Sequence, residues 1–133
     1  RSRGRARAPE VSVGPRATIG ADVRFVADAS GRADRVEVGG DCWIGRGARV
    51  MAGVSIGAGA VVRPYSVVLD DVRPFAVVEG NPAVEVARRF DDATVAALGE
   101  LAWWDWSDAE VAAHAEDLRS SDGIAALGRL RQR

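Results

Sequence analysis

Aliphatic residues recur at every sixth position through the first half of the chain, separated by polar and glycine-rich positions. The longest unbroken series is Val38, Ile44, Val50, Ile56, Val62 and Val68. Four positions after each of these stands a smaller or β-branched residue, in the series Cys42, Ala48, Val54, Ala60, Ser66 and Val72. An earlier block follows the same rule, with Val13, Ile19 and Phe25 leading and Ala17, Val23 and Ala29 following.

A period of six matches neither the 3.6-residue helix nor a simple two-residue alternation. It matches a triangular coil with three short flat sides, each of which turns one aliphatic residue inward, and three units complete one coil. Stacked coils pair their strands at a spacing of about 4.8 Å and bury the aliphatic residues in columns. The sequence therefore predicts an all-β solenoid, a left-handed parallel β-helix of hexapeptide repeats, followed by an α-helical tail. The hand is inferred from the hexapeptide pattern.

The rhythm is interrupted in two places. Thirteen positions separate Phe25 from Val38, one more than two units, so residues 30–37 are expected to hold an extra residue and to bulge from the coil. After residues 70–71 the rhythm ends, and residues 80–83 read as a turn that closes the coils. We therefore divide the chain into a basic arm (1–10), the β-helix (11–83) and a helical tail (84–133).

Several features of the tail are typical of helices. Val95, Leu98 and Leu101 lie at helical spacing, and residues 107–110 read as a capping box that begins a second helix. A last short helix is expected around Ile124, Leu127 and Leu130. Three tryptophans at positions 103, 104 and 106 are interpreted as packing residues rather than as a ligand platform.

Composition excludes several classes of function. The formal net charge is −1, which implies neither nucleic acid nor an anionic membrane as a partner. A single cysteine rules out an internal disulfide framework and favours the cytoplasm, and no apolar stretch is long enough to span a bilayer. The single histidine, His114, cannot supply the several ligands of a zinc hydratase, so no metal is expected.

Further motifs carry a resemblance to a known family. The segments at residues 40–45, 53–57 and 66–68 resemble those of the hexapeptide acyltransferases. Residues 80–83, 88–90 and 103–106 (GNPA, RRF and WWDW) are similar to motifs of the xenobiotic acetyltransferases, which include the type B chloramphenicol and streptogramin A enzymes. The resemblance covers about residues 13–133. It implies a homotrimer with acetyl-CoA, or another acyl-CoA, along the groove between neighbouring subunits and a small-molecule acceptor.

In that family a histidine on a protruding loop deprotonates the acceptor hydroxyl. The matching segment here is residues 30–34, in which Gly31 occupies the place of the histidine. Where the family has a small residue beside the pantetheine arm this chain has Arg63, followed by Pro64, and where a lysine often follows the last coil it has Asp70. The resemblance places the cofactor beside five residues of this chain: Trp43, Arg63, Pro64, Arg88 and Arg89.

Three functional interpretations remain open. The first is acyl transfer without the usual base, for which an amine acceptor is better suited than a hydroxyl; the acids near the loop that could replace the base are Asp28, Asp34 and Glu37. The second is a repurposed trimer whose intersubunit cleft binds or converts another small molecule without CoA, with Asp34, Tyr65 or Arg63 as candidate catalytic residues. The third is a catalytically inactive structural homologue.

Overall fold

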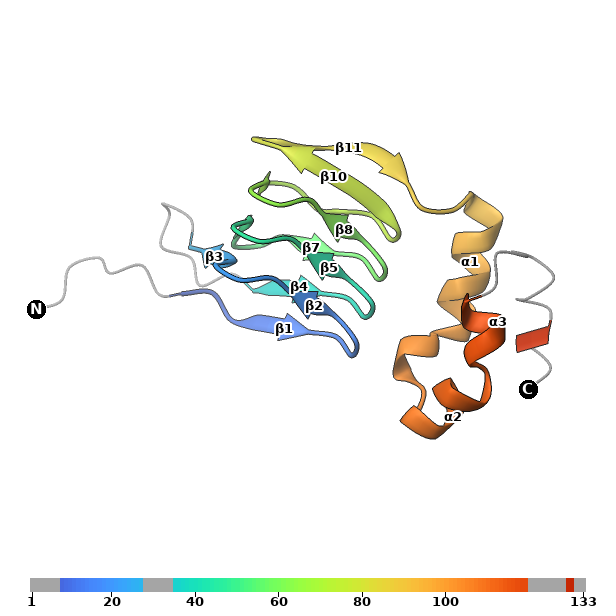
Figure 1. The fold of residues 1–133 in the computed structure, drawn as a ribbon. Coiled ribbons are helices and arrows are strands. Elements are labelled where there is room, and N and C mark those ends of the chain that lie inside the picture. The colour runs from blue at the N-terminus through green and yellow to red at the C-terminus, as the bar shows by residue number, and fades with distance from the viewer. Residues whose placement is uncertain (1–7, 28–34, 120–128, 131–133) are drawn as a thin grey trace, which may run out of the picture. The chain divides into compact units, whose positions relative to one another are not determined.

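The computed structural model describes residues 8–27, 35–119 and 129–130. The chain forms two compact units, residues 1–89 and residues 90–133. Strands make up the first unit and short helices the second, as Figure 1 shows. Of the first unit's strands, nine are short: β1 (Val11–Val13), β2 (Thr18–Ile19), β3 (Arg24–Val26), β4 (Val36–Val38), β5 (Trp43–Ile44), β6 (Arg49–Met51), β7 (Ser55–Ile56), β8 (Val61–Val62) and β9 (Val67–Val68).

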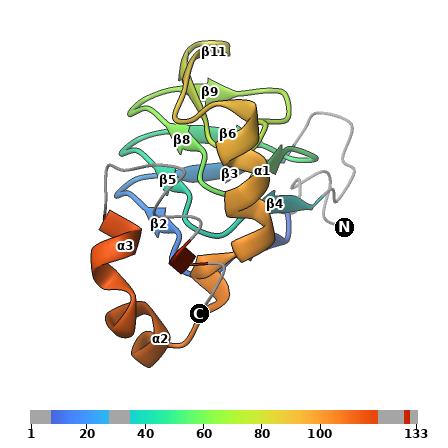
Figure 2. The ribbon, with the colours of Figure 1, turned by 90° about the vertical axis from the view of Figure 1, so that its right-hand side faces the viewer.

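The strands of the first unit belong to three sheets that the chain visits in turn. Sheet A contains β1, β4 and β7, and sheet C contains β3, β6 and β9. Sheet B contains β2, β5 and β8 together with two longer strands, β10 (Ala76–Gly80) and β11 (Ala83–Arg88). All pairs are parallel except the final hairpin of β10 and β11. The chain therefore makes coil 1 (11–26), coil 2 (36–51), coil 3 (55–68) and a last coil that begins at Val72, stacked as Figures 1 and 2 show.

The register of the sheets confirms the six-residue rule. Val38 is paired with Ile56, Ile44 with Val62 and Val50 with Val68, each eighteen positions apart. These leading residues and the smaller residues that follow them are buried and form one continuous core. In coil 1, Val13 is 47% exposed and Ile19 37%, because only coil 2 covers them among the described residues.

The corners between sheets hold backbone in the left-handed region. One column of such residues, between sheets A and B, contains Arg16, Asp41, Gly59 and Phe75; another, between sheets B and C, contains Asp22, Gly47 and Tyr65. From coil 2 onward the backbone N–H of the left-handed residue donates to a carbonyl of the coil before it, as from Tyr65 to Arg46 (2.9 Å) and from Gly47 to Ala21 (2.9 Å). These bonds satisfy polar groups that the sheets leave unpaired at the corners.

Two boundaries differ from the sequence-based expectation. Val13 is paired with Val38, twenty-five positions later, whereas coils 2 and 3 are offset by eighteen, so the insertion after coil 1 is seven residues long and not one. The thirteen positions from Phe25 to Val38 take the place of one six-residue side of the coil. The expectation had assigned them to two sides, which would have left only one extra residue. In addition, the predicted boundary after residue 83 cuts through the final hairpin, since β11 pairs with β10 and belongs to the first unit. The predicted turn at residues 80–83 does join these two strands.

The second unit contains α1 (Asp92–Leu101), a 3-10 turn η1 (Trp103–Asp105), α2 (Asp108–Ala113) and α3 (Ala115–Arg119). The carboxylate of Asp91 caps α1 by accepting from the backbone N–H of Thr94 at 2.8 Å. The predicted capping box is confirmed, because the Ser107 hydroxyl accepts from the N–H of Glu110 at 3.1 Å. Most of the helix expected around Ile124 lies outside the described residues.

Tryptophan packing within this unit agrees with the structural interpretation of these residues. Trp104 and Trp106 are buried, and the indole N–H of Trp106 donates to the carbonyl of Leu101 at 3.2 Å. His114 meets the Trp106 ring edge to face, with the ring centroids 5.7 Å apart. The single histidine therefore serves the packing of the tail.

Candidate functional site

The corner between sheets B and C presents an exposed aromatic side chain. Tyr65 adopts φ 61° there and lies with its ring against Gly47, where an added Cβ would be 2.4 Å from the ring. The side chain is nevertheless 69% exposed, so its hydroxyl is open to solvent. Of the predicted catalytic residues, Asp28 and Asp34, like Gly31, lie outside the described residues, whereas Tyr65 is described.

Trp43 lies on the sheet that ends at this corner. It is paired in register with Thr18 of coil 1 and Val61 of coil 3, and its indole is 41% exposed. Because the next residue, Ile44, is fully buried, Trp43 must face outward. An outward indole on a flat sheet offers a surface on which a planar or apolar group can pack.

Arg63 and Pro64 form the corner just before Tyr65. The backbone N–H of Arg63 donates to the carbonyl of Val78 at 3.0 Å, which fixes the corner to β10. The Pro64 ring lies so close to coil 2 that a Cβ at Gly45 would be 2.8 Å from it. The Arg63 guanidinium is exposed, and no acid of the described residues pairs with it. It is therefore a cation available to an anionic ligand.

Arg89, by contrast, has partners within the chain. Its guanidinium donates to the carbonyl of Gly59 at 2.8 Å, lies 3.5 Å from a carboxylate oxygen of Asp41 and stands 5.6 Å from the centre of the Phe75 ring. These partners belong to the corner between sheets A and B. Arg89 thus fastens the end of β11 to three successive coils, which is a structural role.

Two opposing effects act on the pKa of the Asp41 carboxyl, which lies beside Arg89. Burial raises the pKa of the Asp41 carboxyl above its ordinary value, while the charge and the hydrogen bond of Arg89 lower it; burial is the larger effect.

Arg88 is half-buried and is paired with Ala76 in the hairpin. The five predicted cofactor residues therefore divide between two places: Trp43, Arg63 and Pro64 lie along sheet B up to its corner with sheet C, and Arg88 and Arg89 lie at the end of β11.

Glu37 is the one acid near the insertion that the structure describes. It lies on sheet A, in register with Ser12 and Ser55, and is exposed between the buried residues Val36 and Val38. The insertion itself connects the end of β3 in sheet C with the start of β4 in sheet A. Glu37 is therefore on a different sheet from Trp43 and from the corner that holds Tyr65.

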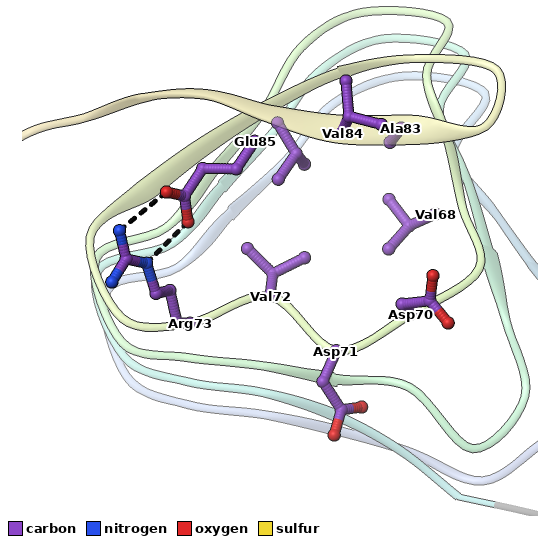
Figure 3. Close-up of a pocket in the computed structure, with 9 residues that line it drawn as sticks. Val68, Asp70, Asp71, Val72, Arg73, Ala83, Val84 and Glu85 are labelled. Atoms are coloured by element: carbon purple, nitrogen blue, oxygen red, sulfur yellow. Dashed lines mark hydrogen bonds and ion pairs between the residues drawn. The ribbon is translucent and has the colours of Figure 1, made fainter.

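A cavity that the sequence analysis did not predict lies beneath the final hairpin, with a volume of about 370 Å³ (Figure 3). It is lined by Val68, Asp70, Asp71, Val72, Arg73, Val78, Ala83, Val84 and Glu85. Two of its carboxylates already have partners, because Glu85 receives two 2.7 Å hydrogen bonds from Arg73 and Asp71 accepts from the N–H of Ser55 at 2.8 Å. The sequence feature that could have indicated this cavity is the acidic pair Asp70 and Asp71, which stands where the hexapeptide rhythm stops.

The remaining candidates for chemistry are inert or absent among the described residues. Cys42 points into the core, its thiol donates to the carbonyl of Gly57 at 3.0 Å, and burial raises its pKa to about 11, so it is not a thiolate nucleophile. No group of three or more His, Cys, Asp or Glu side chains that could hold a metal occurs in the described part of the chain. Within the same residues, no helix is long and apolar enough to cross a bilayer.

Comparison with known proteins agrees with this architecture. The family described as "Bacterial transferase hexapeptide (six repeats)" matches residues 35–70. A chloramphenicol acetyltransferase of Klebsiella aerogenes is 43% identical over 95 residues, which cover 71% of this chain and 45% of that protein. A probable macrolide acetyltransferase of Lysinibacillus sphaericus is 39% identical over 90 residues, covering 68% and 50%. The chain spans about half the length of these relatives.

Among solved structures, a hexapeptide-repeat acetyltransferase of Vibrio cholerae in complex with acetyl coenzyme A is similar, with a TM-score of 0.55 and 30% identity over 61% of this chain and 50% of that one. A galactoside acetyltransferase in complex with coenzyme A shares the fold at a TM-score of 0.53 and 23% identity, covering 62% and 50%. The resemblance found in the sequence motifs is confirmed: residues 35–70 match the hexapeptide transferase family, and the chain is similar to chloramphenicol and macrolide acetyltransferases.

Proposed function

We propose that this protein transfers an acyl group from acyl-CoA to a small-molecule acceptor, preferably an amine. The observation that carries the proposal is the 43% identity to a chloramphenicol acetyltransferase over 95 residues. It is supported by the similarity of the fold to a Vibrio cholerae acetyltransferase that binds acetyl coenzyme A.

We further propose that the coils wind left-handed and that three copies of the chain pack side by side. The hexapeptide repeat supports the winding. Support for the assembly comes from apolar side chains that the single chain leaves exposed outside the proposed ligand sites, among them Val84 and Val86 of β11. Sedimentation velocity is expected to give a species of three times the mass of the chain; a monomer at micromolar concentration would contradict the assembly.

The donor is assigned to sheet B and its corner with sheet C. The Trp43 indole offers an apolar surface for the pantetheine arm, and the Arg63 guanidinium offers a charge-assisted hydrogen bond to a phosphate. Tyr65 stands exposed next to both corner residues and is placed to donate its hydroxyl proton to a carbonyl oxygen. Because Arg89 already has partners within the chain, Arg63 is preferred as the phosphate ligand.

The chemistry follows from the lack of a proton acceptor at Gly31. A positioned base contributes about 10²- to 10⁴-fold to the attack of a hydroxyl, and a glycine cannot supply it. A neutral amine attacks the thioester carbonyl carbon without prior deprotonation; the C–S bond then breaks, the CoA thiolate leaves, and the surplus proton of the nitrogen passes to solvent or to a nearby carboxylate. Asp34 is the preferred carboxylate, with Asp28 as the alternative.

Calorimetric titration with acetyl-CoA tests the donor site. Stoichiometric binding that weakens about tenfold or more in Arg63→Gln is expected, since a hydrogen bond to a charged group contributes about 1.5–3 kcal/mol. Arg35→Gln is the control, because Arg35 is also an exposed arginine of the first unit but lies next to sheet A and not at the proposed donor site. Absence of binding at millimolar acetyl-CoA would end the proposal in favour of a trimer repurposed for another ligand or of an inactive homologue.

Transfer itself is measured by the release of free CoA with a thiol reagent. The protein contributes little background, because its single cysteine is buried and its pKa is raised to about 11. Turnover with a panel of amines is expected to exceed turnover with the corresponding alcohols. If Asp34 takes up the proton, Asp34→Asn lowers kcat and Asp28→Asn does not; unchanged kcat in both variants would leave solvent as the acceptor of the proton.

A further inference from the structure

Two arginines stand side by side on the outer face of sheet C. Arg24 of β3 is paired in register with Arg49 of β6, so their backbones are about 4.8 Å apart. The residues after them, Phe25 and Val50, belong to the core, so both arginine side chains point outward. Both are exposed. The face therefore carries two positive charges at adjacent positions of one column.

Neither guanidinium is neutralised within the described residues. Two other arginines of the first unit do have acidic partners: Arg73 pairs with Glu85 at 2.7 Å and Arg89 with Asp41 at 3.5 Å. By contrast, no acid of the described residues forms an ion pair with Arg24 or Arg49. Like charges opposite each other on neighbouring strands are destabilising. An anion between the two side chains would convert this repulsion into two attractions.

The rest of the same face is apolar. Val67 follows Arg49 in the column, and the second outward column contains Val26 paired with Met51. Leu69, directly after β9, is 49% exposed. No acid occupies an outward position of β3, β6 or β9. The surface thus combines a pair of cations with an adjoining apolar patch, which suits a small molecule that has one anionic and one apolar part.

We propose that this face of sheet C binds a small molecule through a carboxylate or a phosphate held between Arg24 and Arg49, with its apolar part on Met51 and Leu69. The identity of this molecule as the acyl acceptor rests on the proposed function. Its location fits that role, because the strands of sheet C begin directly after the corner that holds Arg63 and Tyr65, where the donor is assigned. The anion site itself requires no acyl transfer.

Thermal unfolding at low ionic strength tests the anion site with phenyl phosphate as the probe and phenol as its neutral counterpart. Phenyl phosphate is expected to raise the Tm of the wild type and of the control Arg35→Gln, and phenol is not. The dissociation constant should rise about tenfold or more in Arg24→Gln and in Arg49→Gln, and the double variant should lose the response. Phenylacetate, in a parallel titration, distinguishes a carboxylate site from a phosphate site.

The ligand-free variants provide a second readout. If the two cations repel each other, Arg49→Gln unfolds at a higher temperature than the wild type at low salt, and the difference shrinks as salt screens the charges. A simple solvated arginine would produce neither effect. An equal response of the double variant and the wild type to phenyl phosphate, or an equal response of the wild type to phenol, would overturn the inference.

Assays of acyl transfer with different acceptors distinguish this inference from the proposed function. We expect 4-aminobenzoate or 4-aminophenyl phosphate to be acylated with a higher kcat/KM than aniline, and this preference to vanish in the Arg24→Gln/Arg49→Gln variant while acetyl-CoA affinity is retained. Loss of acetyl-CoA affinity in that variant would assign the pair to the donor and overturn the inference. If the wild type binds phenyl phosphate but not acetyl-CoA, the anion site stands and the proposed function fails.

Discussion

Two glycines at neighbouring corners lie under aromatic rings and differ in one respect. A Cβ added at Gly59 would be 2.2 Å from the ring of Phe75, and one at Gly47 would be 2.4 Å from the ring of Tyr65. The backbone is the same at both, with φ of +69° and +70°. Phe75, however, is 2% exposed, whereas Tyr65 is 69% exposed. We predict that Gly59→Ala destabilises the fold much more than Gly47→Ala does.

The magnitudes follow from these positions. An alanine in the left-handed region costs about 1–2 kcal/mol, and this cost applies to both variants. Side chains are accommodated in this conformation at other corners, as at Arg16 and Asp41, so the cost does not prevent folding. The buried Phe75 ring cannot move without disturbing its surroundings, and overpacking adds about 1–3 kcal/mol. We expect a total loss of about 2–5 kcal/mol for Gly59→Ala and about 1–2 kcal/mol for Gly47→Ala.

Urea denaturation followed by tryptophan fluorescence measures both losses, at one protein concentration because assembly would shift the midpoint. The double variant Gly59→Ala/Phe75→Leu is the internal check: the smaller side chain makes room, so Gly59→Ala should destabilise this background less than it destabilises the wild type. Equal losses for the two glycine variants, or additive losses in the double variant, would refute the reasoning that the ring contact decides the difference.

Three further variants test contacts of the fold. Arg89→Gln should destabilise the protein by about 1–3 kcal/mol in urea denaturation yet leave acetyl-CoA affinity within about twofold; a large loss of affinity would restore Arg89 as a cofactor ligand. Burial raises the pKa of the Asp41 carboxyl, so its contribution to stability falls as pH rises from the ordinary value of 3.8 through the higher folded-state pKa. Asp41→Asn should remove that slope from the pH dependence of Tm, and an unchanged slope would contradict it. Asp91→Ala should cost about 1 kcal/mol through the lost cap of α1, seen as a lower Tm; no change would mean that the cap is dispensable.

The six-residue rule predicted the core of the first unit well. Each inward position from Val38 to Val72 is buried, because the rule encodes which side chain of each flat side points to the axis. The helix that begins at Asp92 and the Ser107 cap were also visible, since helical spacing and capping residues are local signals. The strand β11 was missed because its alternation, with Val84 and Val86 exposed, departs from the hexapeptide rhythm.

The motif resemblance named the residues of the proposed donor site, but the arginine pair on sheet C could not be read from the sequence. The rule gives the inward or outward direction of a residue, but it does not say which residue of the next coil lies beside it. Arg24 and Arg49 are neighbours because coil 2 follows coil 1 after twenty-five positions, a number that is not a multiple of six. A search at the regular offset of eighteen would have paired Arg24 with Cys42, which lies in the core. The two cations were therefore seen together only in the structure.

The same register makes removal of the insertion a direct test. Deleting residues 28–34 joins Ala27 to Arg35 and restores the eighteen-residue offset between coils 1 and 2. The surrounding hydrogen bonds already fit this junction, because the N–H of Ala52 donates to the carbonyl of Val26 at 2.8 Å and that of Gly53 donates to the carbonyl of Arg35 at 3.0 Å.

At the new corner Arg35 takes the position that Gly53 holds in the next coil, with φ of 89°, so the deletion is best combined with Arg35→Gly. We expect this variant to fold, to unfold cooperatively in urea and to keep its response to phenyl phosphate, since Arg24 and Arg49 stay paired. Acyl transfer should be lost if Asp34 or Asp28 serves the reaction, because both are removed. A variant that unfolds, or that folds but no longer responds to phenyl phosphate, would show that the coils depend on the insertion and that the register alone does not build the anion site.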